Sequence, residues 1–165
     1  TEDGILIDVR QSSTLNDTIP IQEAAYARVG IKVKFNIISS GYYSTVMNPA
    51  KQSDMSASGW GADWANASTV IPELFASFGG FNLSQNTNDP AYKAFEDKVN
   101  IAMKTTDRKK QADMWKALDK EAMKNFWVLP TTFGKAQEIW GSGLGGVFFW
   151  VPQGNPAYGK IWVKK

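Results

Sequence analysis

The sequence contains no cysteine and no histidine among its 165 residues. Without cysteine the chain can form no disulfide framework and offers no thiolate nucleophile. Without histidine it lacks the commonest general base and the commonest side-chain ligand of transition metals. These absences exclude cysteine- and histidine-dependent catalysis, Ser-His-Asp triads and nearly all zinc sites. They leave open chemistry that uses two carboxylates, and calcium sites built from oxygen ligands.

The chain also has little net charge. It contains 18 Lys and Arg and 16 Asp and Glu side chains, which give a formal net charge of +2. Nucleic-acid binding depends on clustered Lys and Arg that neutralise phosphates, so the composition predicts no nucleic-acid partner. No apolar run approaches the roughly 18 residues of a membrane-spanning helix. No signal peptide is visible either, so an exported protein would need a start that precedes Thr1.

Aromatic side chains are abundant, with 7 Trp, 9 Phe and 5 Tyr in a chain that is 43% hydrophobic. This composition suffices for one domain, or for most of one lobe of a larger protein, to bury a core. Core packing accounts for most of the rings, and the remainder can form the walls of a ligand pocket.

The N-terminal part of the sequence predicts a βαβ unit. Residues 5–10 and 31–38 alternate apolar and polar side chains as strands do. Residues 20–30 between them predict a helix with Pro20 in its first turn and Gly30 at its end. Strands joined by such a crossover run parallel. Further short elements are expected: a helix near 42–50, a strand at 54–59 and a helix at 72–78.

The C-terminal half predicts two amphipathic helices followed by strands. Asp89 and Asp107 are suitable N-caps, and apolar side chains recur at helical spacing after each. Residues 126–133 and 135–140 read as strands, and residues 161–163 as a last short strand. The chain is therefore predicted to be one mixed α/β unit.

The most distinctive segment places Asp63 between Trp60 and Trp64, next to the small residues Gly61 and Ala62. A carboxylate between two indoles suits an ammonium group, because it offers a charge-assisted hydrogen bond and the rings offer cation–π contacts. The small residues would let a ligand approach the backbone. An alternative is a turn in which Asp63 caps local amides and both indoles belong to the core.

Other constellations point less clearly to chemistry. The polar loop 84–89 lacks the EF-hand pattern, and the Gly-rich run 141–146 precedes no helix that could complete a dinucleotide loop. A glycosidase would need two carboxyl groups roughly 5–10 Å apart, and no spacing requires any pair to meet. The candidates for such a pair are Asp54, Asp63, Glu73 and Glu138.

Two stretches carry a resemblance that extends over nearly the whole chain. The strand–helix–strand start leads into MSASGWGADW at 55–64, and DPAYKAFEDKVNIAMK continues through to LPTTF at 89–133. In order and spacing they resemble the bacterial extracellular solute-binding proteins of family 5, the oligopeptide and dipeptide binders. The segment WANASTVIPELF at 64–75 most resembles the corresponding segment of actinobacterial members. The chain lacks the Arg that can precede the motif, since Ser56–Ser58 stand there, and the proline that often follows it.

The resemblance implies a type II periplasmic-binding fold, a mixed sheet with flanking helices that begins with a βαβ unit. Residues 1–140 would be the main part of the C-terminal ligand-binding lobe and residues 141–165 a Gly/Pro-rich return segment. It also implies that Asp63 pairs with the α-ammonium of a peptide and that Trp60 lines a side-chain pocket. Thr132 and Phe133, after Pro130, are weaker candidates for the same cleft.

The same resemblance implies a role in import rather than catalysis. We expect a monomer that captures a peptide and delivers it to a membrane permease of an ABC transporter, without a cofactor. It would act in the periplasm or, as a lipoprotein, at the extracellular face of the membrane. Because members of this family also bind sugars and other solutes, an oligosaccharide ligand remains the alternative.

Overall fold

The structure of the chain is a computed structural model that describes residues 4–85, 88–135, 137–151 and 154–165. The chain divides into two compact units, each built from two segments. Unit 1 comprises Thr1–Gly59 and Glu73–Glu96, and unit 2 comprises Trp60–Pro72 and Asp97–Lys165. Within the described ranges, no helix is both long and apolar enough to cross a membrane.

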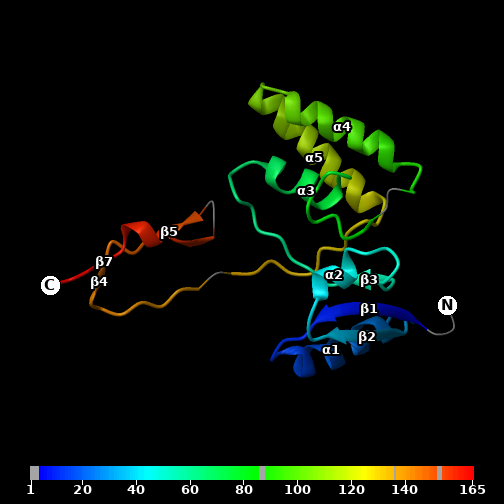
Figure 1. Cartoon of the computed structure of the whole chain (residues 1–165), viewed down its shortest axis with the longest axis horizontal. Helices are drawn as coiled ribbons and strands as arrows, with labels where there is room; N and C mark the ends of the chain where they lie inside the picture. The colour runs from blue at the N-terminus through cyan, green and yellow to red at the C-terminus, as the bar shows by residue number, and fades with distance from the viewer. Residues whose placement is uncertain (1–3, 86–87, 136, 152–153) are drawn as a thin grey trace. The chain divides into compact units, whose positions relative to one another are not determined.

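Unit 1 contains the predicted βαβ unit. Strand β1 (Ile5–Arg10) lies between β2 (Val33–Ile38) and β3 (Met55–Ser56), and both neighbours run parallel to it. Helix α1 (Leu15–Ala27) connects β1 to β2 and lies against the sheet (Figure 1). One cluster of buried residues in this unit consists of Ile7, Val9 and Val33, against which Ile5, Leu15, Tyr26, Phe35 and Met55 pack.

Helix α1 begins at Leu15, earlier than predicted. Pro20 therefore lies inside the helix and not in its first turn. Leu15, the first helical residue, packs against the core of the sheet, so burial favours a helix that extends beyond the proline. The predicted end is confirmed. Gly30 adopts a φ of +77°, a conformation that side chains disfavour, and its N–H donates to the carbonyl of Ala27 at 3.0 Å.

A buried carboxylate lies at the centre of the sheet. Asp8 of β1 is 0% exposed and accepts hydrogen bonds from Asn36 Nδ2 (2.7 Å) and from both the N–H and the hydroxyl of Ser53 (2.8 Å each). The hydroxyl of Tyr42, the first residue of α2 (Tyr42–Val46), reaches the carbonyls of Asp8 and Ala57. Burial, together with the nearby charge of Asp8, raises the pKa of Tyr42 to about 12.

The second segment of unit 1 contains the end of α3 (Ile71–Phe75) and the start of α4 (Tyr92–Lys104). Phe75 and Phe95 pack edge to face with ring centroids 6.0 Å apart, and Tyr43 and Phe81 do so at 5.4 Å. Asp89 accepts a hydrogen bond from the N–H of Ala91 at 2.8 Å, which confirms the predicted cap.

A polar cluster lies beside this aromatic packing. Burial raises the pKa of Glu96, but hydrogen bonds from the N–H and hydroxyl of Ser77 outweigh it and leave the pKa below its usual value. Burial and a hydrogen bond with Glu96 raise the pKa of Tyr92 to about 12.

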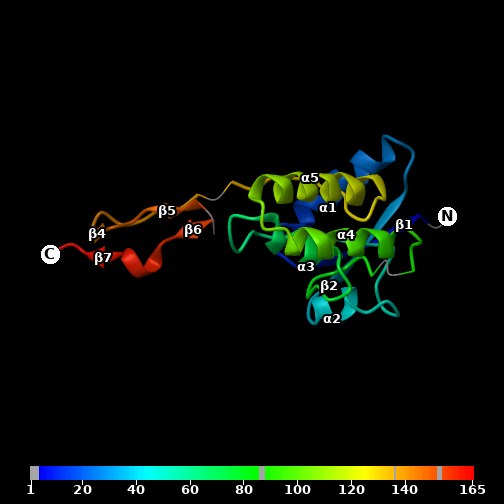
Figure 2. The same cartoon turned by 90° about the horizontal axis from the view of Figure 1, so that it is seen from above.

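Unit 2 contains the 3₁₀ helix η1 (Ala67–Thr69) and α5 (Arg108–Lys124). Asp107 caps α5 as predicted, since its Oδ1 accepts from the N–H of Lys110 at 2.9 Å. The part of α4 in unit 2 runs alongside α5 in both views (Figures 1 and 2), with an ion pair of 2.7 Å between Lys98 and Glu121. The buried residues of the two helices in this unit are Val99, Ala102, Gln111, Trp115, Leu118 and Ala122.

The strands predicted at 126–133 and 135–140 are wrong for every residue that the structure describes there, and Ala136 lies outside the described residues. These residues have no regular secondary structure. Phe133 is 99% exposed and Ile139 is 95% exposed. A strand is stable only where a neighbour pairs with its backbone, and the pattern of the side chains cannot supply that neighbour.

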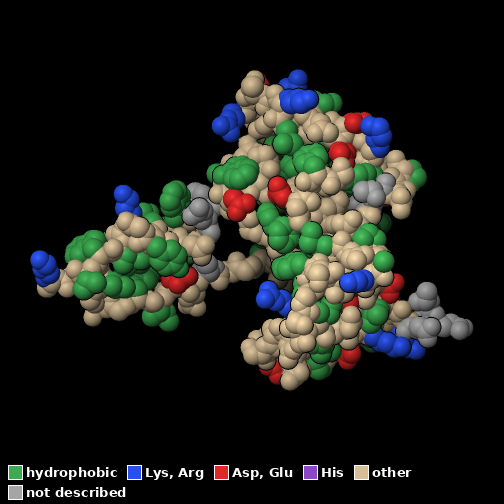
Figure 3. All heavy atoms as spheres, in the orientation of Figure 1, with side chains coloured by type: hydrophobic (Ala, Val, Ile, Leu, Met, Phe, Trp, Pro, Cys, Tyr) green, Lys and Arg blue, Asp and Glu red, His purple; other side chains and the backbone are tan. Residues whose placement is uncertain are grey.

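The last residues form two short antiparallel pairs. Strand β4 (Leu144–Gly145) pairs with β7 (Trp162–Val163), and β5 (Phe149–Trp150) pairs with β6 (Asn155–Pro156). The predicted strand at 161–163 is thus confirmed. Gly145 lies directly beneath the indole of Trp162, where a Cβ would overlap the ring. Figure 3 shows hydrophobic side chains gathered on the surface of this segment. The exposed ones are Phe148, Phe149, Trp150, Val151, Tyr158, Trp162 and Val163.

Candidate ligand-binding site

The segment Trp60–Trp64 forms an irregular loop in unit 2 that one buried threonine holds in place. The hydroxyl of Thr69, which is 0% exposed, donates to Asp63 Oδ2 at 2.8 Å and accepts from the N–H of Asp63 at 3.1 Å. The carbonyl of Thr69 accepts from Trp60 Nε1 at 2.7 Å. Thr69 therefore fixes the acidic residue and the preceding indole at once.

Thr69 binds only one of the two oxygens of the Asp63 carboxylate. Thr69 occupies Oδ2, whereas Oδ1 makes no hydrogen bond with the residues that the structure describes, and the side chain is exposed. An ionised carboxylate oxygen with no protein donor can accept a charge-assisted hydrogen bond from a cationic ligand. The local turn contact and the ligand contact, which the sequence presented as alternatives, are thus compatible with each other.

The two indoles of the loop differ in their surroundings. Trp60 is half-buried and anchored to the carbonyl of Thr69, whereas Trp64 is 53% exposed and donates from Nε1 to the hydroxyl of Ser68 at 3.0 Å. That bond fixes the edge of the Trp64 ring while about half of the side chain stays open to solvent. Trp64 is therefore the indole with more surface to offer a ligand.

Between the indoles, the backbone is open. Gly61 and Ala62 are exposed, and a Cβ added at Gly59 or Gly61 would meet nothing within 4 Å. Backbone N–H and carbonyl groups in this position can pair with an extended peptide without regard to its side chains.

The weaker candidates Thr132 and Phe133 lie in an irregular segment of unit 2. Phe133 is 99% exposed and so packs against no side chain, and Thr132 lies exposed in the same irregular segment. Their assignment to the cleft stays a prediction.

Sequence reasoning missed the polar residues that hold the loop. Asn66, Ser68 and Thr69 lie within five residues of the end of the GWGADW motif, whereas Gln111 lies 45 residues beyond Asn66, on α5. Three polar side chains within four residues, just before the apolar residues that lead into α3, are a local signal for caps. No pattern in the sequence pointed to Gln111.

Two of the four carboxylates considered for hydrolysis accept hydrogen bonds from the backbone. Asp54 Oδ2 accepts from the N–H of Leu6 at 2.8 Å, and Glu73 Oε2 accepts from the N–H of Gly80 at 2.9 Å. Across the described ranges, no group of three or more acidic side chains could hold a metal ion.

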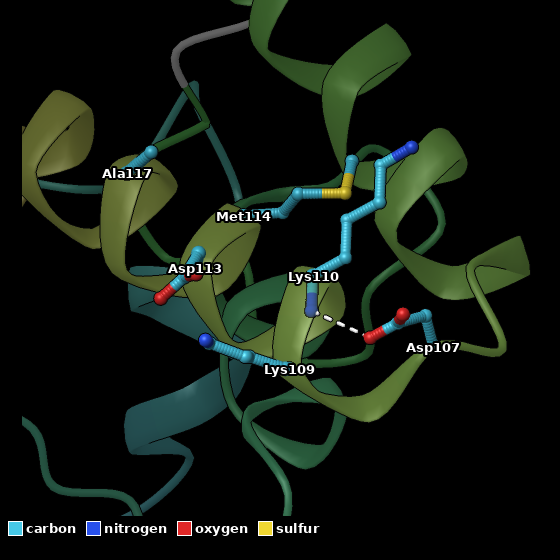
Figure 4. Close-up of a pocket in the computed structure, with 6 residues that line it drawn as sticks. All are labelled: Asp107, Lys109, Lys110, Asp113, Met114 and Ala117. Carbon is cyan, nitrogen blue, oxygen red and sulfur yellow. Dashed lines mark hydrogen bonds between the residues drawn. The ribbon is translucent and has the colours of Figure 1, made fainter.

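An open hollow lies at the start of α5 (Figure 4), where Asp107 accepts from the backbone N–H of Lys110. None of the predicted ligand-binding residues lines it. Its lining consists of Asp107, Lys109, Lys110, Asp113, Met114 and Ala117.

Comparison with solved structures decides the fold. The chain is similar to the clavulanic acid biosynthesis oligopeptide binding protein 2, with a TM-score of 0.78 and 18% identity over 99% of this chain. It is also similar to the oligopeptide-binding protein AppA from Bacillus subtilis, solved with a nonapeptide (TM-score 0.66, 15% identity, 99% of this chain). The chain has the type II periplasmic-binding-protein fold. This confirms the predicted fold class.

A further similar structure is the ABC transporter-associated periplasmic binding protein DppA from Helicobacter pylori with the peptide STSA (TM-score 0.66, 17% identity, 99% of this chain). The chain spans 31% of the first of these proteins and 32% of each of the other two. It therefore corresponds to about a third of their length. No protein-family model matches the sequence, and no curated protein matches it.

Proposed function

We propose that this chain is the ligand-binding part of a longer substrate-binding protein of an ABC importer, and that Asp63 holds the amino end of a peptide. The observation that carries the proposal is that only one oxygen of the Asp63 carboxylate has a hydrogen-bond donor among the described residues. Thr69 fixes Asp63 through Oδ2 and leaves Oδ1 with no donor among the described residues. A primary ammonium group can donate one hydrogen bond to that oxygen and direct its other N–H groups elsewhere.

The proposal extends to the groups around Asp63. Trp64, with 53% of its surface exposed, would cover the ammonium group and the first side chain, and Trp60 would form the inner wall. The open backbone at Gly61 and Ala62 would pair with the main chain of the peptide. Pairing with the main chain is indifferent to the peptide's sequence, which suits a carrier of mixed peptides.

The wider role is a proposal that the fold supports, whereas the site does not bear on it. Fold neighbours of this chain are peptide-binding proteins by name, and one is described as a periplasmic, ABC transporter-associated protein. We therefore propose that the longer protein works outside the cytoplasmic membrane, hands its ligand to a permease and catalyses no reaction. Residues 1–140 would form most of one lobe and residues 141–165 a return segment toward the other.

The test is native mass spectrometry of the full-length protein with a casein hydrolysate, before and after acetylation of the peptides' amino groups. We expect the protein to retain free peptides and not acetylated ones. Asp63→Asn should raise the half-saturating concentration about 10- to 150-fold, since a hydrogen bond to a charged group contributes about 1.5–3 kcal/mol.

The matched control is Asp119→Asn, which removes the same charge at an exposed position of α5. It should retain peptides as the wild type does. Equal retention of free and acetylated peptides, or an Asp63→Asn variant with unchanged binding, would rule out the ammonium role. Retention of oligosaccharides in place of peptides would identify a sugar binder.

A further inference from the structure

The candidate ligand loop is tied to the turn between α4 and α5 by a chain of amide hydrogen bonds. Asn66 Nδ2 donates to Gln111 Oε1 at 2.9 Å, across 45 residues of sequence. Gln111 Nε2 in turn donates to the carbonyls of Ala102 and Thr105, each at 3.0 Å. Gln111 is 9% exposed, so this amide is held almost entirely inside unit 2.

The other end of the Asn66 amide faces the loop itself. Asn66 Oδ1 accepts from the N–H of Ser68 at 2.9 Å and so caps η1. Ser68 accepts from Trp64 Nε1 through its hydroxyl, and the next residue, Thr69, holds Asp63 and Trp60. The Asn66 side chain thus connects Gln111 to the short 3₁₀ helix whose Ser68 and Thr69 contact the loop.

The hydrogen bonds fix the orientation of both side-chain amides, so that neither can be reversed. If the Gln111 amide were reversed, its oxygen would face the carbonyl oxygens of Ala102 and Thr105. If the Asn66 amide were reversed, its NH₂ group would face the N–H of Ser68. Each reversal sets like groups against each other in a part-buried site, so only one orientation of each amide forms these four hydrogen bonds.

We propose that Gln111, acting through Asn66, is a positioning residue that sets the geometry of the peptide site at Asp63 and Trp64. The inference rests on the proposed function of Asp63, which it deepens. A ligand contact of hydrogen-bond length tolerates displacements of only a few tenths of an ångström. The loop is irregular and cannot define its own position, whereas α5 is a 17-residue helix capped by Asp107. Gln111 transfers the position of the helix to the loop.

Two substitutions each remove a different hydrogen bond of this series while the size of the side chain is kept. Asn66→Asp retains an oxygen for the N–H of Ser68 but sets its second oxygen against Gln111 Oε1. Gln111→Glu can still accept from Asn66 but loses the donor to Ala102 and Thr105. The matched controls are Asn16→Asp and Gln22→Glu, which make the same chemical changes at exposed positions of α1.

The experiment records two quantities in the full-length protein. The first is the ¹H–¹⁵N indole signals of Trp60 and Trp64, assigned with the Trp60→Phe and Trp64→Phe variants. The second is the half-saturating concentration of the casein hydrolysate. We expect Asn66→Asp and Gln111→Glu to move the Trp64 signal and to raise that concentration about tenfold, as the loss of one hydrogen bond would. The two controls should change neither.

The outcomes separate this inference from the proposed function. Unmoved indole signals in Asn66→Asp would overturn the positioning role. So would moved signals with unchanged peptide binding, provided that Asp63→Asn weakens binding, because the chain would then be structural only. If Asp63→Asn itself leaves binding unchanged, the proposed function fails and the positioning role fails with it.

Discussion

The carboxylate of Asp8 accepts both the backbone N–H and the hydroxyl of Ser53 at 2.8 Å, although 45 residues separate the two in sequence. This double contact holds the approach to β3 against the central strand of the sheet. The next link is the N–H of Ala57, which donates to the carbonyl of Asp8 at 2.9 Å. Asp8 thus holds both Ser53, two residues before β3, and Ala57, directly after it, within unit 1.

Replacing this buried carboxylate should destabilise unit 1. In Asp8→Asn the new amide can keep one acceptor, but its NH₂ group would face donors of Ser53 or Asn36. We expect the free energy of unfolding to fall by about 1.5–3 kcal/mol, measured by urea denaturation. Asp119→Asn, at an exposed position, should change it by no more than about 0.5 kcal/mol. Equal effects of the two variants would contradict a special role for Asp8.

Stability should fall steeply in alkali because of two buried tyrosines. The pKa values of Tyr42 and Tyr92 are raised from 10.0 to about 12, first by burial. Above pH 10 the unfolded chain releases these protons while the folded chain still holds them, so stability decreases from pH 10 until both states are ionised near pH 12. Urea midpoints measured between pH 8 and 12 should show this decline. It should be shallower in the double variant Tyr42→Phe/Tyr92→Phe, and an unchanged slope would refute the assignment.

The hydroxyl of Thr69 should matter more for ligand binding than its shape. Thr69→Val keeps the branched side chain but leaves both the N–H and Oδ2 of Asp63 without their partner. We expect peptide binding to weaken about tenfold, since Asp63 loses a hydrogen bond that orients it. Thr69→Ser restores the hydroxyl and should retain most of the affinity. Equal affinity of the valine and serine variants would show that Asp63 needs no support from Thr69.

The contact between Gly145 and Trp162 gives a prediction for the C-terminal pairs. A methyl group at Gly145 would overlap the indole, whereas one at Gly143 would meet nothing within 4 Å. Gly145→Ala should therefore open the β4–β7 pair, while Gly143→Ala should preserve it. Amide hydrogen exchange at Lys164, whose N–H donates to the carbonyl of Gly143 at 2.8 Å, measures the difference. Equal protection of Lys164 in both variants would contradict the packing.

Local signals in the sequence predicted the parts of the fold that depend on neighbouring residues. Asp89 and Asp107 were identified as caps from their position before apolar repeats, and both accept the expected backbone hydrogen bonds. Gly30 was identified as a helix end and has the positive φ that favours glycine there. In each case the cause lies within a few residues, so the sequence pattern contains it.

Predictions failed where the cause lies elsewhere in the chain. The start of α1 depends on packing of Leu15 against the sheet, which outweighs the preference of Pro20 for a first turn. The apolar residues of 126–133 have strand-like composition, but composition does not supply a strand to pair with.

The candidate site likewise combines residues that a local pattern indicates with residues that only distant contacts reveal. The chemistry of Asp63 and its two indoles could be predicted from six adjacent residues, and their assignment to a ligand remains a prediction. Gln111 could not be found, because a hydrogen bond across 45 residues leaves no periodic or local mark. The residues that contact a ligand can thus be suggested by a motif, whereas those that hold the motif in place required the structure.

The position of β1 in its sheet has a consequence for synthesis of the chain. It is the central strand of its three-stranded sheet yet precedes both partners in the sequence, since they follow at Val33–Ile38 and Met55–Ser56. At about 5–20 residues per second, the 45 residues between Asp8 and Ser53 take the ribosome roughly 2–9 seconds. During that time β3 is not available to pair with β1, and an unpaired strand edge can pair with another chain. Variants that slow translation between Ile38 and Ser53 should therefore lower the yield of folded protein without changing its stability.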